Sequence, residues 1–209
     1  RFDAYRVGIY VLDVSGHGVA SALLSVHLSR ILTRLDEKDA ELRKPGAAPG
    51  AAGLTPPSEV VAHLNAKFSD NPGSGQFFTL LYGILDFEDK SFRYTSAGHP
   101  GPIIYSPGKG AIHKPTPPAI GFLANAAFKE QTLTVESGDR LYLYTDGLFE
   151  IENDDGEQWG EERLFAAAAT GASLPIQANL DAILAAAREW NGKDFSLPDD
   201  LSLLGVAIR

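Results

Sequence analysis

The sequence contains no cysteine, and this absence removes several classes of chemistry. Disulfides, thiolate nucleophiles and cysteine-ligated zinc are excluded, while the redox compartment is left open. Methionine is absent as well, even at the first position, where Arg1 stands. Because average usage would supply a handful of methionines in a chain of this length, we expect a fragment whose domain continues upstream.

Positive charge and long apolar runs are also scarce. Lys and Arg total 18 against 27 acidic residues, which gives a formal charge of −9 and no basic stripe. Nucleic acid is therefore not an expected partner, since binding to a phosphate backbone needs clustered positive charge. No run approaches the roughly 18 apolar residues of a membrane span, and no signal peptide is visible. We expect a cytoplasmic protein without a membrane span.

What remains is the composition of an ordinary globular protein, with 44% apolar and 22% charged residues in a chain of 209. This length suits one domain with a sizeable core, and we predict a single domain over residues 1–209. Residues 38–57 are rich in Ala, Gly and Pro and poor in bulky apolar side chains. They are predicted to form a flexible surface insertion.

Apolar patterns predict both strands and helices. Residues 7–14 are almost continuously apolar, which indicates a strand covered on both faces, and the helical spacing over 19–35 indicates a long amphipathic helix. Tight turns between several short apolar runs favour antiparallel pairing. The predicted fold class is α+β, with helices covering the sheets. Further strands are expected at 77–87, 91–96, 101–105, 131–135, 140–144 and 201–208, and further helices at 58–68, 161–170 and 175–190.

Acidic residues stand at the ends of three of the expected strands. Asp13 ends the first, Asp146 follows 140–144, and Asp199 and Asp200 precede the last. Taken alone, each is typical of a helix cap or a turn. Taken together, they are positions that only a fold can join, and their oxygen ligands suit magnesium, manganese or calcium. Because two such ions promote in-line displacement at phosphorus, we predict phosphoryl hydrolysis.

Five short motifs strengthen this interpretation. They are Asp-Val-Ser-Gly-His-Gly at 13–18, Phe-Thr-Leu-Leu-Tyr-Gly at 78–83, Ser-Ala-Gly-His-Pro at 96–100, Tyr-Thr-Asp-Gly at 144–147 and Asp-Asp-Leu-Ser-Leu at 199–203. In this order they resemble the SpoIIE-like bacterial branch of the metal-dependent type 2C serine/threonine protein phosphatases, over almost the whole chain. The resemblance implies an α-β-β-α layered sandwich of two mostly antiparallel sheets flanked by helices. It also implies hydrolysis of phosphoserine or phosphothreonine in a partner protein.

The resemblance further implies roles for the acidic residues. Asp13 would bridge two manganese or magnesium ions and the Val14 carbonyl would bind one of them. Asp146 and Asp199 would hold the other ion, with Asp200 the less favoured ligand of its pair. The nucleophile would be metal-activated water. The acidic motif that the family carries just upstream of the first strand is absent, so we expect one metal site to be incomplete in this fragment.

The turn after the first strand carries Ser15, Gly16, His17 and Gly18. Its glycines let backbone amides approach a phosphate or a metal-bound water. His17 has two readings, a general acid or a residue that holds the turn, and we favour the second because water can also protonate the leaving group. A triad built on Ser15 is discounted, since nothing resembles a Gly-x-Ser-x-Gly elbow. His99 is expected to be structural.

The main hypothesis is a phosphatase output domain fused upstream to a sensory or receiver module. By resemblance, its substrate would be a phosphorylated regulatory protein, an antagonist of an anti-sigma factor, in a partner-switching signal transduction pathway. Two alternatives stay open. One is a non-catalytic phosphatase-fold binding module, and the other is a metal-dependent hydrolase of small phosphoesters whose selectivity lies in surface loops.

Overall fold

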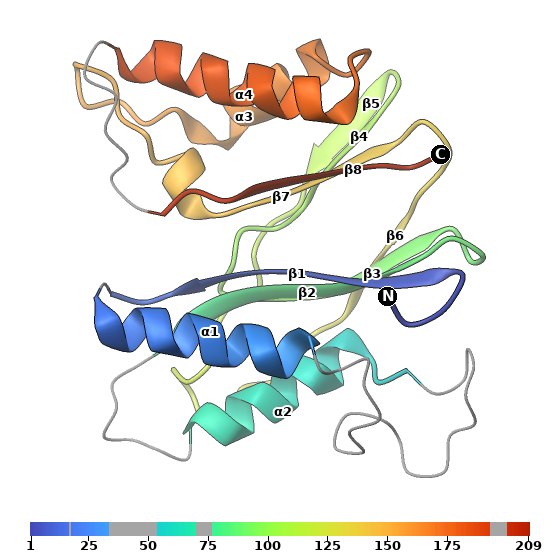
Figure 1. The fold of residues 1–209 in the computed structure, drawn as a ribbon, viewed down its shortest axis with the longest axis vertical. Coiled ribbons are helices and arrows are strands. Elements are labelled where there is room, and N and C mark those ends of the chain that lie inside the picture. The colour runs from blue at the N-terminus through green and yellow to red at the C-terminus, as the bar shows by residue number, and fades with distance from the viewer. Residues whose placement is uncertain (17, 34–53, 70–76, 193–199) are drawn as a thin grey trace. The chain divides into compact units, whose positions relative to one another are not determined.

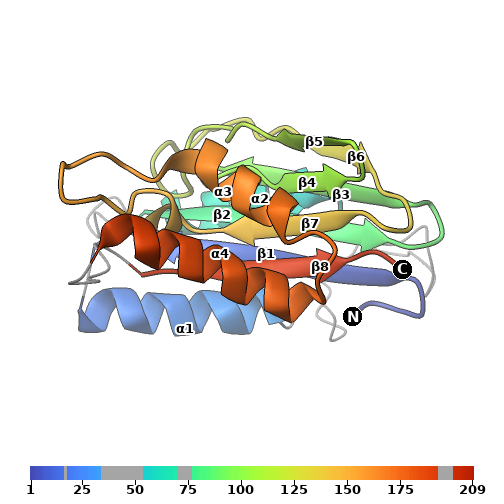
Figure 2. The ribbon, with the colours of Figure 1, turned by 90° about the horizontal axis from the view of Figure 1, so that it is seen from above.

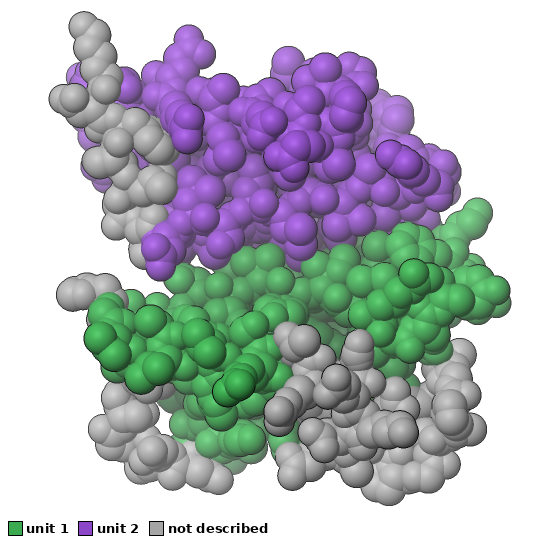
Figure 3. Space-filling model, in the orientation of Figure 1, with its two compact units in different colours: residues 1–99, 115–134 green, residues 100–114, 135–209 purple. Residues whose placement is uncertain are grey.

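A computed structural model describes residues 1–16, 18–33, 54–69, 77–192 and 200–209 (Figure 1, Figure 2). They form two compact units, coloured separately in Figure 3. Unit 1 comprises residues 1–99 and 115–134, and unit 2 comprises residues 100–114 and 135–209. Most of the predicted insertion lies outside the described residues, so the single domain and the flexible insertion stay predictions.

Unit 1 is built on a four-stranded antiparallel sheet with the strand order β1-β2-β3-β6. The helices α1 (Val19–Thr33) and α2 (Pro57–Ser69) cover one face of this sheet (Figure 1). The strands are β1 (Arg6–Val14), β2 (Phe78–Asp86), β3 (Ser91–Ala97) and β6 (Gln131–Thr134).

The alternation of side chains along β2 separates the two faces of this sheet. Leu80 and Ile84 pack in one apolar cluster with Leu28 of α1 and Leu64 of α2. The odd-numbered side chains of β2 therefore leave the sheet on the face away from the helices. Residues directly opposite one another in an antiparallel pair point to the same face, so their partners on β1 share that second face.

Unit 2 contains a second four-stranded antiparallel sheet, with the order β5-β4-β7-β8. The helices α3 (Gly160–Thr170) and α4 (Ile176–Asn191) lie beside one another and pack on this sheet (Figure 2). A short 3-10 helix, η3 (Asp146–Leu148), follows β7. The strands are β4 (Ile103–Ser106), β5 (Lys109–Ile112), β7 (Arg140–Tyr144) and β8 (Leu203–Ala207).

A buried polar residue joins the layers of unit 2. Asn179 of α4 is fully buried and accepts a hydrogen bond from the Tyr142 hydroxyl of β7. Its amide nitrogen donates to the Ala168 carbonyl of α3, at 3.3 Å. Because buried polar groups are costly unless they are paired, this arrangement fixes both helices relative to β7.

The predicted α+β class with antiparallel sheets is confirmed. Each predicted strand and helix is present, and the bounds agree within two residues over the described chain. The structure adds one strand that is not among the predicted elements, β5, which begins at Lys109. The helix α2 also begins at Pro57, one residue inside the predicted insertion. Within the described residues, every helix is too short or too polar to cross a membrane.

Candidate active site

The first predicted metal ligand lies at the end of β1. Asp13 and Val14 are the last two residues of the strand, and both are half-buried. Asp13 stands opposite Thr79 of β2, and Val14 stands opposite Phe78. A carboxylate at a paired strand end has a fixed backbone and still reaches solvent, as a metal ligand requires.

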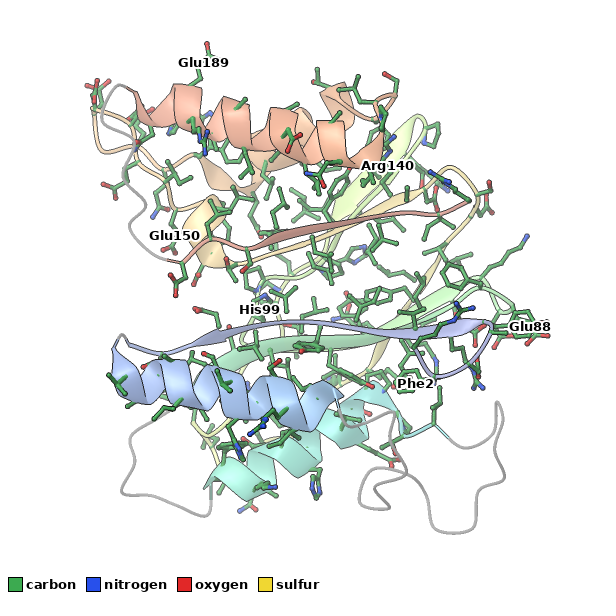
Figure 4. All side chains as sticks on the ribbon, in the orientation of Figure 1. Phe2, Glu88, His99, Arg140, Glu150 and Glu189 are labelled. Carbon is green, nitrogen blue, oxygen red and sulfur yellow. The ribbon has the colours of Figure 1, made fainter. Side chains whose placement is uncertain are left out.

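Thr79 and His99 form a hydrogen-bonded pair next to Asp13. The Thr79 side chain leaves the sheet on the same face as Asp13, because the two residues are directly opposed. A hydrogen bond of 2.8 Å joins Thr79 Oγ1 and His99 Nδ1. His99 is fully buried and accepts a 2.6 Å bond at its carbonyl from the Ser96 hydroxyl. Figure 4 shows His99 on the side of β1 and β2 away from α1.

The turn after β1 is anchored to the start of β2. Ser15 donates two hydrogen bonds to the Phe77 carbonyl, from its backbone N at 3.1 Å and from its hydroxyl at 2.6 Å. That hydroxyl is committed to the backbone, which agrees with discounting Ser15 as a nucleophile. Gly16 and Gly18 have φ angles of +80° and +96°, which side chains rarely adopt. His17 lies outside the described residues.

The second predicted ligand lies in unit 2, directly after β7. Asp146 opens η3, is half-buried, and its Oδ1 accepts a 3.0 Å bond from the backbone N of Gly147. Thr145 precedes it and binds the segment before β8 through three hydrogen bonds. Its hydroxyl donates to the Asp200 carbonyl at 3.1 Å and accepts from Ser202 N at 2.8 Å, while its own N donates to the Ser202 carbonyl at 3.1 Å. Thr145 thereby holds the backbone at Asp200 next to Asp146.

Thr145→Val is expected to lower the free energy of unfolding by about 2 kcal/mol and to weaken metal-dependent activity. Thr145 is buried, and valine keeps its shape but leaves the Ser202 N–H and the Asp200 carbonyl without their hydroxyl partner. Denaturant unfolding and a manganese titration of activity measure the two effects. Thr145→Ser is the control, because it retains the hydroxyl and should stay close to wild type. Equal stability of the valine variant would contradict the role of this hydroxyl.

The structure brings the predicted residues together in two groups. Asp13, Val14, Ser15, Gly16 and Gly18 share one strand end of unit 1. Asp146 belongs to unit 2, where Thr145 ties it to Asp200. Asp199 and His17 lie outside the described residues, and among the described ones no three acidic or histidine side chains gather as a metal cluster. The set of ligands therefore stays a prediction.

The chemistry of the available donors fits a hard cation. Asp13 and Asp146 offer carboxylate oxygens and Val14 offers a backbone carbonyl, with no thiolate anywhere in the chain. Oxygen donors of this kind suit magnesium and manganese. Tyr144, which precedes Thr145, is not part of this donor set. Burial and its hydrogen bond to Glu161 raise the pKa of the Tyr144 hydroxyl, so it stays protonated.

Comparison with known proteins gives a consistent result. The family model described as Stage II sporulation protein E (SpoIIE) matches residues 3–209. The phosphoserine phosphatase RsbP of Bacillus subtilis is 29% identical over 152 residues, which cover 72% of this chain and 35% of RsbP. The phosphoserine phosphatase RsbU of the same organism is 24% identical over 207 residues, covering 97% of this chain and 56% of RsbU. The chain thus spans about a third to about half of these relatives.

A solved structure shares the fold over the full chain. The SiaA-PP2C domain of Pseudomonas aeruginosa superposes with a TM-score of 0.81 at 18% sequence identity, covering 100% of this chain and 78% of that domain. The fold expected from the five motifs is therefore confirmed.

Proposed function

This chain belongs to the SpoIIE family, and we propose that it is a metal-dependent serine/threonine protein phosphatase. The observation that carries the proposal is the position of Asp13 and Asp146, each half-buried at or just after the end of a paired strand. The similarity to RsbP and RsbU, both phosphoserine phosphatases, supports the same reaction.

Manganese or magnesium ions, two in number, would be held by Asp13, the Val14 carbonyl, Asp146 and Asp199. Bound there, they would supply Lewis acidity toward the phosphoryl oxygens and lower the pKa of water. Other parts of the chain would orient the substrate. Gly16 and Gly18 present an exposed backbone turn whose amides suit an anion, and Thr79, fixed by His99, holds the surroundings of Asp13 in place.

The proposed substrate is a phosphorylated regulatory protein, of the type that antagonises an anti-sigma factor. This finer assignment is supported by the similarity to RsbP and RsbU and by the absence of a basic stripe that would favour nucleic acid. Control by an upstream sensory or receiver module is part of the same proposal. The protein would then act in the cytoplasm as the output of a signalling pathway.

Phosphate release from a phosphoserine protein and from p-nitrophenyl phosphate is expected to require manganese or magnesium and to stop when the metal is chelated. The reason is that the proposed carboxylates would hold metal ions that activate water, while the Ser15 hydroxyl is hydrogen-bonded to the Phe77 carbonyl. Colorimetric phosphate detection with and without metal measures this.

Two results would replace the proposal with an alternative. Stable, metal-dependent binding of a phosphorylated partner without phosphate release would favour a binding module. Turnover of small esters that greatly exceeds turnover of every phosphoprotein would favour a small-phosphoester hydrolase.

A further inference from the structure

Three large apolar side chains lie exposed together beside the turn after β1. Phe77, Phe122 and Leu123 are 40%, 68% and 55% exposed. The rings of Phe77 and Phe122 meet edge to face with their centroids 6.1 Å apart. We call these three residues the aromatic patch. Grouped exposed apolar side chains, unlike single ones, are typical of a surface that contacts a partner.

The exposure of the patch does not come from a loosely held loop. The buried side chain of Asn65 in α2 donates to the carbonyls of Leu123 and Ala124, at 2.8 and 3.1 Å, and accepts from Gly121 N at 3.0 Å. Just before these residues, Ile120 is fully buried and exchanges two backbone hydrogen bonds with Phe78. The fold therefore holds the backbone on both sides of Phe122 while its ring points to solvent.

The patch adjoins the proposed phosphate turn. The Phe77 carbonyl accepts both hydrogen bonds from Ser15, and Phe78 is directly opposite Val14. A residue bound on the patch would thus lie next to the turn that we assign to the phosphate. Chain segments on either side of a phosphoserine in that turn must pass over the surface that surrounds it.

The chemistry of this surface selects the kind of segment that fits. Residues 115–128, which include Phe122 and Leu123, contain no Asp, Glu, Lys or Arg. A charged flank would lose hydration there and would find no ion-pair partner in residues 115–128, whereas an apolar side chain would bury its own surface and that of the rings. Aromatic side chains are also the residues that most often dominate binding energy at protein interfaces.

We propose that the aromatic patch is a docking surface for the phosphoprotein substrate, and that it selects apolar residues next to the phosphoserine. This inference rests on the proposed phosphatase function. It assigns Phe122 and Leu123 a role in substrate selection rather than in the chemical step.

Two short phosphoserine peptides of equal charge test the proposal. One carries Leu and Phe on both sides of the phosphoserine, and the other carries Ser and Gly. With manganese present, the wild-type protein is expected to hydrolyse the apolar peptide with a kcat/KM about tenfold higher, the scale of one good aromatic contact. Phe122→Ala should reduce the ratio of apolar-peptide to p-nitrophenyl phosphate turnover by about the same factor, and Leu123→Ser should reduce it less.

Phe87→Ala is the matched control. Phe87 is also an exposed phenylalanine, at 44%, and it follows the other end of β2, about 30 Å from the patch along the nine-residue strand. This variant should keep the wild-type ratio. An unchanged ratio in Phe122→Ala, with p-nitrophenyl phosphate still hydrolysed, would overturn the docking surface and leave the phosphatase intact. A change of oligomeric state in Phe122→Ala, with unchanged peptide preference, would instead assign the patch to a second copy of the chain.

Failure of the proposed function gives a different result. In that case the wild-type protein releases phosphate from neither peptide nor from p-nitrophenyl phosphate in manganese. That result would contradict the proposed phosphatase function and, with it, the docking surface that rests on that function.

Discussion

Asp13→Asn is expected to lower metal-dependent phosphate release by at least about 100-fold while leaving the fold intact. Asparagine has nearly the same shape, and Asp13 is only half-buried at the end of β1, so the strand pairing with Thr79 is retained. The amide lacks the negative charge with which a carboxylate bridges two divalent ions. Loss of an outer-shell partner already reduces metal affinity or activity by about 10- to 100-fold, and loss of a direct ligand should exceed that.

Two measurements separate this effect from a loss of structure. Calorimetric manganese titration should show weaker binding in the variant, and thermal unfolding without metal should match wild type. Asp89→Asn is the control, because Asp89 is an exposed acid in the turn after β2 and its replacement removes the same charge from unit 1. Full manganese-dependent turnover in Asp13→Asn would remove Asp13 from the proposed site. Asp146→Asn provides the same test in unit 2.

Most of the fold could be predicted because the apolar pattern within each short stretch of sequence is enough to indicate its strand or helix. Residues 7–14 are apolar almost without interruption, and β1 is indeed a strand paired with β2, although most of its residues are only partly buried. The strand β5 could not be found in this way, because Lys109–Ile112 is short, largely exposed and contains a glycine. It exists through its pairing with β4, and no periodicity in the sequence encodes that pairing.

The candidate site likewise has parts that the local sequence predicts and parts that depend on contacts between distant residues. Acids at strand ends are visible in the sequence, because the strand and the charged residue are neighbours in the chain. The residues that hold these acids are not visible, because their partners are distant. Thr145 binds the backbone at Asp200 and Ser202, and Thr79 binds His99, each across a loop or several elements. Both threonines belong to the motifs at 78–83 and 144–147, yet only the hydrogen bonds reveal what each side chain contacts.

Gly101→Ala is expected to destabilise the protein by about 3 kcal/mol or more. Gly101 is buried between Pro100 and Pro102, and a Cβ there would lie 1.9 Å from the carbonyl oxygen of His113. That oxygen belongs to backbone, and the amide of the same residue donates to the Pro102 carbonyl at 3.0 Å. The clash can be relieved only by separating two paired backbone segments, so it exceeds the usual 1–3 kcal/mol of overpacking.

Thermal unfolding measures this loss, which should lower Tm by about 10 °C in a chain of this size. Gly156→Ala is the informative comparison, because its φ is +78° and its Cβ would meet no atom within 4 Å. It isolates backbone strain, for which about 1–2 kcal/mol is expected. If the two variants melt together, the approach of His113 to Gly101 relaxes freely and the glycine serves only chain flexibility. If Gly101→Ala melts well below, close backbone packing explains why the segment that follows His99 needs glycine.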